Sequence, residues 1–221
     1  MAMASSDVME SDRRAFRRRQ TIEEALDIAV AIMEEVGVGG LSMSEIARRL
    51  GIRQPSLYKY FPSLHAVYDA LFARGLARSD DAVQAAARPE PPGVPRIRSG
   101  AKAWVRWAME NPALAQLLIW RPVPRFEPTG ATFAVSEQQM AQIRAEFAEA
   151  VRCGQLRPDA DSVDTLRLYT IVLSGVISQQ LANEPGARHD TGTFSGLIDA
   201  GLDMFFARFE VIGGSRAESR P

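Results

Sequence analysis

The stretch that decides the fold is ARRLGIRQPSLYKYF, residues 47–61. Its first residues continue a helical pattern that begins at SMSEI, and Gly51 interrupts this pattern, because glycine readily adopts the left-handed backbone that ends a helix. Pro55 suits the first turn of a new helix, where its missing N–H costs no hydrogen bond. Two short helices joined by a glycine turn predict a helix-turn-helix over residues 43–62.

The apolar residues of this stretch indicate which face of the second helix is buried. Leu57 and Phe61 are one turn apart, and Ile46 and Ile52 have the spacing to bury on the same side. The outward face then carries Gln54, Ser56, Tyr58, Lys59 and Tyr60. A short helix whose outward face is rich in hydrogen-bond donors is suited to the DNA major groove.

Each outward side chain has a matching chemical partner on duplex DNA. Gln54 can pair with an adenine edge, while Pro55 and Ser56 can contact a thymine methyl group. Lys59 can bond a guanine edge or a phosphate, and the two tyrosine hydroxyls can bond phosphates. The alternative interpretation is that the two tyrosines are half-buried packing residues with solvated hydroxyls.

The composition limits the class of protein without naming a partner. The chain has 221 residues, 46% of them hydrophobic, which is enough for one or two domains with a core. Its formal net charge is −1, so total charge argues neither for nor against a nucleic-acid partner. Local charge says more, because five of the seven residues Arg13–Arg19 are arginine. This stretch is either a solvated arm or an arm that contacts phosphates or a minor groove.

Helical periodicity recurs along the chain, and no run alternates as strand residues do. GVGG at residues 37–40 ends the first helix, Ser42 and Glu45 have the spacing of a capping box, and Ser63 can cap the fourth helix. The chain is predicted to be all-α with about nine helices: one up to residue 36, then 42–50, a short one from residue 55, 63–87, 96–110, 112–120, 133–153, 161–183 and 193–211.

The segment from about residue 17 to residue 71 resembles the N-terminal domain of TetR-type transcriptional repressors. The signs are the break at Gly37, Ser42 ahead of EIA, LGI at residues 50–52, and SLYKYF at residues 56–61 followed by a fourth helix. The resemblance implies an all-α homodimer that binds a palindromic operator in double-stranded DNA. It also implies that a small ligand in the C-terminal domain triggers release from the operator.

The same resemblance implies that Ser42 and Ser44 bond phosphate. Where the family commonly has a lysine in the first turn of the fourth helix, this chain has Leu64 followed by His65. That phosphate contact is therefore missing, or it is made by His65 or by the Arg13–Arg19 arm; otherwise His65 is an ordinary helix-start residue. The predicted DNA-contact set is Arg17, Arg18, Ser42, Ser44, Arg53, Gln54, Pro55, Ser56, Tyr58, Lys59, Tyr60 and His65.

The last two predicted helices carry more apolar residues than one buried face needs. Phe194 to Phe209 form a continuous apolar stripe, and residues 163–177 are apolar on more than one side. Such helices are expected to pack against both their own core and a second subunit. The alternative is burial within one chain. The predicted dimer-interface residues are Val172, Val176, Leu197, Gly201 and Phe205.

Aromatic and methionine residues gather between residues 104 and 147 and include all three tryptophans. Such side chains line adaptable apolar pockets, and they also fill ordinary cores. The predicted ligand-pocket residues are Trp104, Trp107, Met109, Leu117, Trp120, Phe126, Phe133, Met140, Phe147 and Tyr169. The proline-rich segment at residues 121–130 is either a pocket lid or a connector.

No motif points to an enzyme. The sequence has no glycine-rich phosphate loop, nucleophile elbow or zinc-helix spacing, and Cys153 is its only cysteine. We therefore predict no catalytic residue, no metal site and no cofactor. The N-terminus lacks the apolar core of a secretory signal, and the longest apolar run, residues 168–177, is too short for a membrane span. The predicted compartment is the cytoplasm.

The predicted organisation is a disordered tail at residues 1–12, a DNA-binding domain at 13–63, a regulatory and dimerisation domain at 64–211 and a disordered tail at 212–221. The main functional prediction is a repressor released by a largely apolar ligand. The alternative is a regulator that ignores ligands, namely an activator, a constitutive DNA binder or one controlled by a partner protein. A large apolar cavity would favour the first, and a solid core the second.

Overall fold

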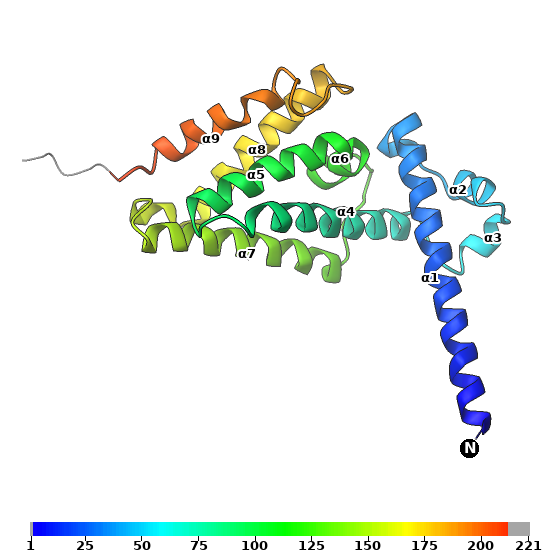
Figure 1. The fold of residues 1–221 in the computed structure, drawn as a ribbon. Helices are drawn as coiled ribbons and strands as arrows, with labels where there is room; N and C mark the ends of the chain where they lie inside the picture. Colours follow the sequence, from blue (N-terminus) through cyan, green and yellow to red (C-terminus); the bar gives the residue numbers. More distant parts are fainter. Residues whose placement is uncertain (1, 212–221) are drawn as a thin grey trace, which may run out of the picture. The chain divides into compact units, whose positions relative to one another are not determined.

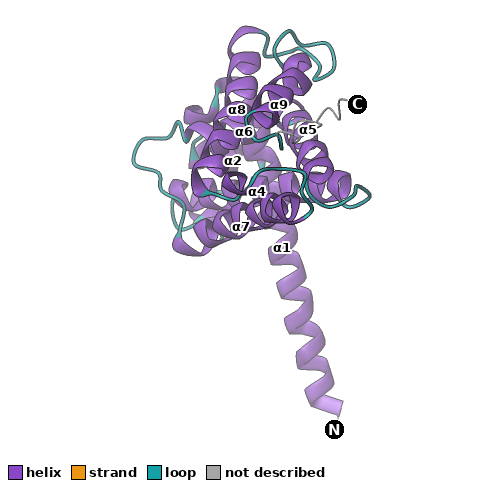
Figure 2. Cartoon of the chain, turned by 90° about the vertical axis from the view of Figure 1, so that its left-hand side faces the viewer, coloured by secondary structure: helices purple, strands orange, loops and turns teal. Residues whose placement is uncertain are grey.

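A computed structural model describes the backbone of residues 2–211 and the side chains of residues 12–211, so the tail predicted for 212–221 lies outside the described residues. In chain order the α-helices (Figure 1) are α1 Ala2–Val36, α2 Met43–Arg49, α3 Gln54–Leu57, α4 Leu64–Ala87, α5 Val94–Glu110, α6 Pro112–Trp120, α7 Gly130–Arg152, α8 Val163–Asn183 and α9 Ile198–Ala207. Three 3-10 turns add η1 Val38–Gly40, η2 Pro158–Ala160 and η3 Ser195–Leu197. This range contains no strand (Figure 2), which confirms the all-α prediction. Nor does any helix in it have the length and apolar content to cross a membrane.

The described residues form two compact units, each built from two separate segments of the chain. Unit 1 comprises residues 2–76 and 112–133, and unit 2 comprises residues 77–111 and 134–211. This division differs from the boundary predicted at residue 63. The first half of α4 and the segment after α6 group with the helix-turn-helix for the packing reasons given below, and α6 belongs to the same unit.

α1 is a single helix of 35 residues. In place of the disordered tail predicted for residues 1–12, the structure has helix from Ala2 onward. No glycine or proline occurs between Ala2 and Val36, and alanine, methionine, glutamate and arginine are good helix formers, so nothing local stops the helix earlier. The N-terminal half of α1 extends past α2 and α3 (Figure 1). The helix ends where Gly37 adopts a φ of +83°.

The first half of α4 holds unit 1 together. The buried hydroxyl of Tyr68 donates a hydrogen bond of 2.6 Å to the Val38 carbonyl in η1. Arg74 donates to Asp27 of α1 at 2.6 Å and also pairs with Glu23. These contacts attach α4 to both α1 and η1, which explains why its first half belongs with the helix-turn-helix.

The proline-rich segment at residues 121–130 is fastened to α4 within unit 1. Phe126 is buried, and its ring lies 5.7 Å from that of Tyr68. Asp69 accepts hydrogen bonds from the Thr129 N–H at 2.8 Å and from the Thr129 and Thr132 hydroxyls at 3.1 Å each. Of the two interpretations of this segment, the structure therefore favours a packed connector.

Unit 2 has an aromatic core. Neighbouring ring centroids lie 5.6 Å apart for Phe147 and Tyr169, 5.9 Å for Tyr169 and Phe205, and 5.1 Å for Phe205 and Phe206. Edge-to-face aromatic packing of this kind adds to the free energy gained by burial. The cluster joins α7, α8 and α9.

α9 begins later than predicted, at Ile198 instead of about residue 193. The fully buried Gln180 of α8 explains the delay. Its side-chain oxygen accepts hydrogen bonds from the backbone N–H groups of Phe194, at 3.0 Å, and Ser195, at 2.9 Å. The preceding loop is thereby pinned to α8, and the 3-10 turn η3 separates it from the start of α9.

The turn of the helix-turn-helix is closed by two backbone hydrogen bonds. The N–H of Gly51 donates to the Arg48 carbonyl at 3.2 Å, and the N–H of Ile52 donates to the Ala47 carbonyl at 3.0 Å. This is a Schellman turn with Gly51 in the left-handed position, at φ +72°. The predicted role of Gly51 is therefore confirmed, and Ser42 and Ser63 cap α2 and α4 as predicted.

We expect Gly51→Ala to lower the free energy of unfolding by about 1 kcal/mol, because a Cβ disfavours the left-handed conformation. A Cβ at this position meets nothing within 4 Å, so the cost is one of backbone strain and not of collision. Urea denaturation followed by circular dichroism measures it. Gly130→Ala is the matched control, because Gly130 also has open space around it but an ordinary φ. Equal stability changes in the two variants would contradict this explanation of the turn.

Candidate DNA interface and ligand cavity

The orientation of the short helix α3 is set by two residues. Leu57 is 0% exposed and Phe61 is 4% exposed. The N–H groups of Tyr60 and Phe61 both donate to the Leu57 carbonyl, at 2.9 and 3.0 Å, so the chain keeps turning beyond the end of α3. With Leu57 and Phe61 in the core of unit 1, the other side chains of this segment are left on the outer side.

Most residues of the predicted recognition face are solvent-exposed. Tyr58 is 46% exposed, and its hydroxyl lies 3.4 Å from the side-chain amide of Gln54. Ser56 and Tyr60 are half-buried, so the packing interpretation of the tyrosines fits Tyr60 better than Tyr58. The exposed members of the set on this segment are Arg53, Gln54, Pro55, Tyr58 and Lys59.

Arg18 of α1 reaches the end of this segment. Its guanidinium donates a hydrogen bond of 2.9 Å to the Lys59 carbonyl and lies 5.4 Å from the centre of the Tyr60 ring. A planar guanidinium can satisfy both contacts at once, which an ammonium group cannot. Arg18 therefore joins the arginine stretch of α1 to the predicted recognition face. The side chain of the neighbouring Arg17 has no recorded contact with this face.

The two serines at the start of α2 lie close together. The Ser42 side chain accepts a hydrogen bond from the Glu45 N–H at 3.3 Å, and the two serine hydroxyls are 3.3 Å apart. Glu45 in turn accepts from Arg48 and Arg49, and these hydrogen bonds lower its pKa to about 2. Arg49 also pairs with Glu35 of α1, at 2.6 Å, so α2 is tied to the end of α1.

His65, in the first turn of α4, is exposed and packs edge-on against Phe126, with ring centroids 6.0 Å apart. One side of the His65 ring contacts Phe126, and the remaining exposed part is accessible to a DNA phosphate.

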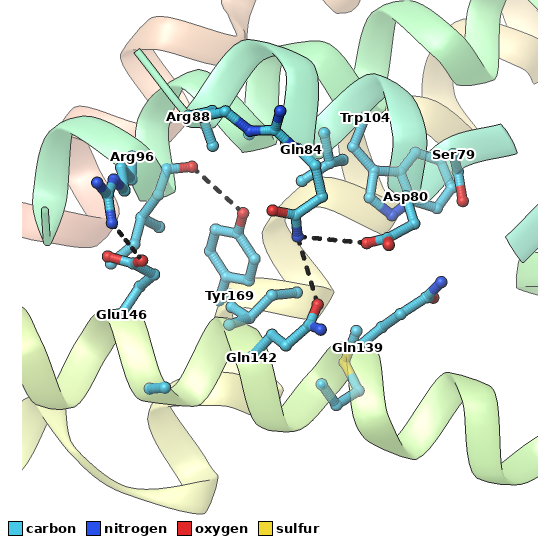
Figure 3. Close-up of a pocket in the computed structure, with 17 residues that line it drawn as sticks. Ser79, Asp80, Gln84, Arg88, Arg96, Trp104, Gln139, Gln142, Glu146 and Tyr169 are labelled. Carbon is cyan, nitrogen blue, oxygen red and sulfur yellow. Dashed lines mark hydrogen bonds and ion pairs between the residues drawn. The ribbon is translucent and has the colours of Figure 1, made fainter. Parts of the chain in front are cut away.

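A cavity of about 460 Å³ lies within unit 2 (Figure 3). Its walls come from α4, α5, α7 and α8, and this volume is within the range of small-molecule sites. The apolar part of the lining is Val83, Ala87, Ile97, Trp104, Met140, Ile143 and Tyr169. Burial raises the pKa of Tyr169, so its hydroxyl remains protonated at neutral pH. That hydroxyl donates only a long hydrogen bond, of 3.5 Å, to the Ile97 carbonyl.

Polar residues make up much of the remaining lining, and the sequence analysis missed most of them. Arg96 pairs with Glu146 at 3.2 Å, while the Gln84 amide lies 3.4 Å from Asp80 and 3.3 Å from Gln142. One signal was available: Asp80 and Gln84 are four residues apart on α4, and Arg88, just past its end, continues the spacing, so the three share one face. Without the partner helices, nothing in the sequence distinguished that face from a solvated one.

The structure brings together three of the predicted pocket residues, Trp104, Met140 and Tyr169. Trp107 and Phe147 are buried in unit 2, Phe147 within the aromatic core, and Met109 also lies in unit 2 without lining the cavity. The other four belong to unit 1 and lie elsewhere than this cavity: Leu117, Trp120, Phe126 and Phe133.

The predicted dimer-interface residues differ in how much of each side chain is exposed to solvent. Leu197 is 56% exposed, while Val172, Val176 and Gly201 are half-buried. Phe205 is 4% exposed, because it packs on Phe147 and Tyr169 within its own chain.

Catalytic chemistry finds little support in the described side chains. Cys153 is exposed at the end of α7, and its thiol donates a hydrogen bond of 3.3 Å to Glu149. This hydrogen bond raises the pKa of the thiol, which opposes the thiolate that a nucleophile requires. Among the described residues, no group of histidine, cysteine and carboxylate side chains could hold a metal ion.

Two family models match this chain. Residues 25–71 match the bacterial regulatory proteins of the tetR family, and residues 97–205 match the tetracyclin repressor-like C-terminal domain. Together these matches cover more than half of the sequence. The chain belongs to the tetR family. Members of this family are DNA-binding transcription regulators and not enzymes, so the helix-turn-helix is the DNA-binding element.

Individual relatives agree with this assignment. The chain is 43% identical over 182 residues to the class A tetracycline repressor of Escherichia coli from transposon 1721, a match that covers 80% of this chain and 77% of that protein. It is 34% identical over 87 residues to the uncharacterized HTH-type regulator YobS of Bacillus subtilis, covering 39% of this chain and only 45% of YobS. The solved structure of AibR in complex with isovaleryl coenzyme A and operator DNA has a TM-score of 0.65, with 17% identity over 84% of this chain and 98% of AibR. At that identity, the likeness to AibR concerns the fold alone.

We expect Arg18→Lys to weaken DNA binding by this TetR-family chain by roughly threefold to tenfold, because lysine keeps the charge but cannot hold both Lys59 and Tyr60. Fluorescence anisotropy with a labelled DNA duplex measures the dissociation constant. Arg17→Lys is the matched control, since the Arg17 side chain makes no contact with this segment that the structure records. Equal effects of the two substitutions would show that the contacts of Arg18 with Lys59 and Tyr60 do not contribute to DNA binding.

Proposed function

We propose that this chain is a homodimeric repressor that binds a palindromic operator and leaves it when a small, largely apolar molecule occupies the cavity of unit 2. The single observation that carries the DNA-binding part is the outward face of the segment after Gly51. Burial of Leu57 and Phe61 leaves Gln54, Tyr58 and Lys59 accessible.

The chemistry of this face suits duplex DNA. Gln54 supplies a donor and an acceptor for a base edge, and Lys59 supplies a charge for a guanine or a phosphate. Arg18 fixes the backbone at Lys59, which limits the motion of the end of the segment. Ser42 and Ser44 at the start of α2, together with the accessible arginines of α1, would add contacts to the phosphate backbone.

The apolar surface of α8 and α9 supports the dimer. Ile171 is 66% exposed and Met204 is 79% exposed, although both side chains are large and apolar. A Cβ at Gly201 would lie 3.6 Å from Val172, an ordinary van der Waals distance, so α8 and α9 pack against each other beside this surface. A second copy of the chain would cover this surface, and two-fold symmetry would present two recognition faces to inverted half-sites about 34–36 Å apart.

The cavity supports ligand control over the alternative of a ligand-independent regulator. A solidly packed unit 2 would have favoured that alternative, whereas the structure has about 460 Å³ of space between α4, α5, α7 and α8. Aromatic and methionine side chains line part of it. Occupation of the cavity would favour the conformations with low affinity for DNA, which releases the operator.

The DNA interface is tested with Lys59→Ala and Tyr58→Ala on a duplex that the wild-type protein selects from random-sequence DNA. We expect roughly tenfold weaker binding, and for Lys59→Ala also a smaller dependence of affinity on salt, because one phosphate or base contact is lost.

Lys102→Ala is the matched control for this test. Lys102 is the second lysine of the chain, and it pairs with Asp199 at 3.2 Å in unit 2. Wild-type affinity in both Lys59→Ala and Tyr58→Ala would exclude this segment as the recognition face.

The dimer is tested with Met204→Glu, which places a charge in the middle of the proposed interface. We expect a monomer in size-exclusion chromatography with light scattering, and a loss of operator affinity of at least tenfold, because one recognition face alone remains. Val135→Glu on α7 puts the same charge on another exposed apolar residue, and this variant is expected to remain dimeric. A dimeric Met204→Glu variant would place the interface elsewhere.

A further inference from the structure

The charged residues that line the cavity differ in how many ion pairs and hydrogen bonds they make. Arg96 donates to Glu146 at 3.2 Å and to the Glu90 carbonyl at 2.9 Å. The second carboxylate oxygen of Glu146 accepts from the Gly93 N–H at 2.9 Å. This pair is therefore already balanced in charge and in hydrogen bonds, and it forms a neutral part of the wall.

Asp80 is different. The hydrogen bond recorded for its carboxylate is a long one, of 3.4 Å, from the neutral amide of Gln84. Within residues 12–211 no lysine, arginine or histidine forms an ion pair with it, and Arg88, the other cation in the lining besides Arg96, is eight residues further along, just past the end of α4. Eight helical residues correspond to about 12 Å along the helix axis. The cavity therefore has one carboxylate without a counter-charge.

The surroundings of Asp80 suit a cation. Figure 3 shows its carboxylate at the same end of the cavity as Trp104, Ser79 and Gln139. The Trp104 indole, which is the best aromatic partner for a positive charge, is half-buried and held edge-to-face against Trp107 with ring centroids 5.8 Å apart. A carboxylate, an indole and amide oxygens together form a site for an ammonium group, whereas a carboxylate ligand would meet repulsion from Asp80.

The rest of the cavity indicates the chemical character of the remaining part of the ligand. Val83, Ile97, Met140 and Ile143 supply apolar walls, and the Tyr169 hydroxyl, with its long hydrogen bond, is a donor near the middle. We infer that the molecule which this cavity binds is an aromatic or alkyl amine in its protonated form, with the ammonium group at Asp80 and Trp104 and the apolar body toward Tyr169. This inference deepens the proposed ligand control and rests on it.

The test uses three compounds with one biphenyl body and different head groups: 4-phenylbenzylamine, 4-phenylbenzyl alcohol and 4-phenylbenzoate. Isothermal titration calorimetry on the full-length wild-type protein is expected to show the amine binding at least tenfold more tightly than either of the others. Asp80→Asn is expected to remove this preference, because the asparagine side chain has a similar shape and no charge.

Asp81→Asn is the matched control. Asp81 is the next residue on α4, exposed and outside the cavity lining, so its substitution is expected to leave the amine affinity unchanged. The preference of the wild-type protein among the three compounds tests the inference even if Asp80→Asn fails to fold. Equal or tighter binding of the alcohol or the carboxylate, or an unchanged preference in Asp80→Asn, overturns the inference.

Failure of the inference is distinguishable from failure of the proposed function. If the carboxylate or the alcohol binds best, and Ala87→Trp, which fills the cavity, abolishes that binding, the cavity is still a ligand site and only the charge assignment is wrong. If none of the three compounds binds the wild-type protein at 1 mM, the amine assignment fails. If instead a compound binds, Ala87→Trp abolishes that binding, and the bound compound does not release DNA, ligand control fails.

Discussion

The burial of Leu57 and Phe61 is the constraint on which the function depends. α3 has four residues, far fewer than an isolated helix needs for stability in water, so its own hydrogen bonds cannot orient it. The orientation comes from two apolar side chains fixed in the core of unit 1, from the Schellman turn at Gly51, and from Arg18, which holds the far end at Lys59. The polar face points outward because both apolar residues of the segment are buried on the opposite side.

Two helices, α4 and α7, each carry residues of unit 1, which contains the helix-turn-helix, and residues that line the cavity in unit 2. α4 carries Tyr68, which is bonded to η1, and further along it carries Asp80 and Gln84 in the cavity lining. α7 starts at a turn held by Asp69 and continues to Gln139 and Glu146, which also line the cavity. Under the proposed ligand control, a ligand that moves the cavity segment of either helix acts on a helix that also carries residues of unit 1.

Sequence reasoning predicted the local elements well and the distant groupings less well. The glycine stops, the serine caps and the burial of Leu57 follow from local rules about backbone and periodicity, and the structure confirms them. The pocket was only partly predictable, because aromatic residues such as Phe126 and Phe147 have the same local signature whether they line a cavity or fill a core. The grouping of α6 with the first half of α4 and the helix-turn-helix, and the capture of the loop before α9 by Gln180, depend on contacts between residues far apart in sequence. No local pattern records such contacts.

Methylation interference tests the central claim most directly, because a methyl group on guanine N7 blocks the major groove and leaves the minor groove open. The wild-type protein is mixed with randomly methylated duplex that carries a selected binding site, and bound and free DNA are compared. We expect interference in two clusters related by a two-fold axis, with centres about one helical turn or roughly 34–36 Å apart. Binding that is indifferent to N7 methylation throughout the site would contradict the entry of this face into the major groove.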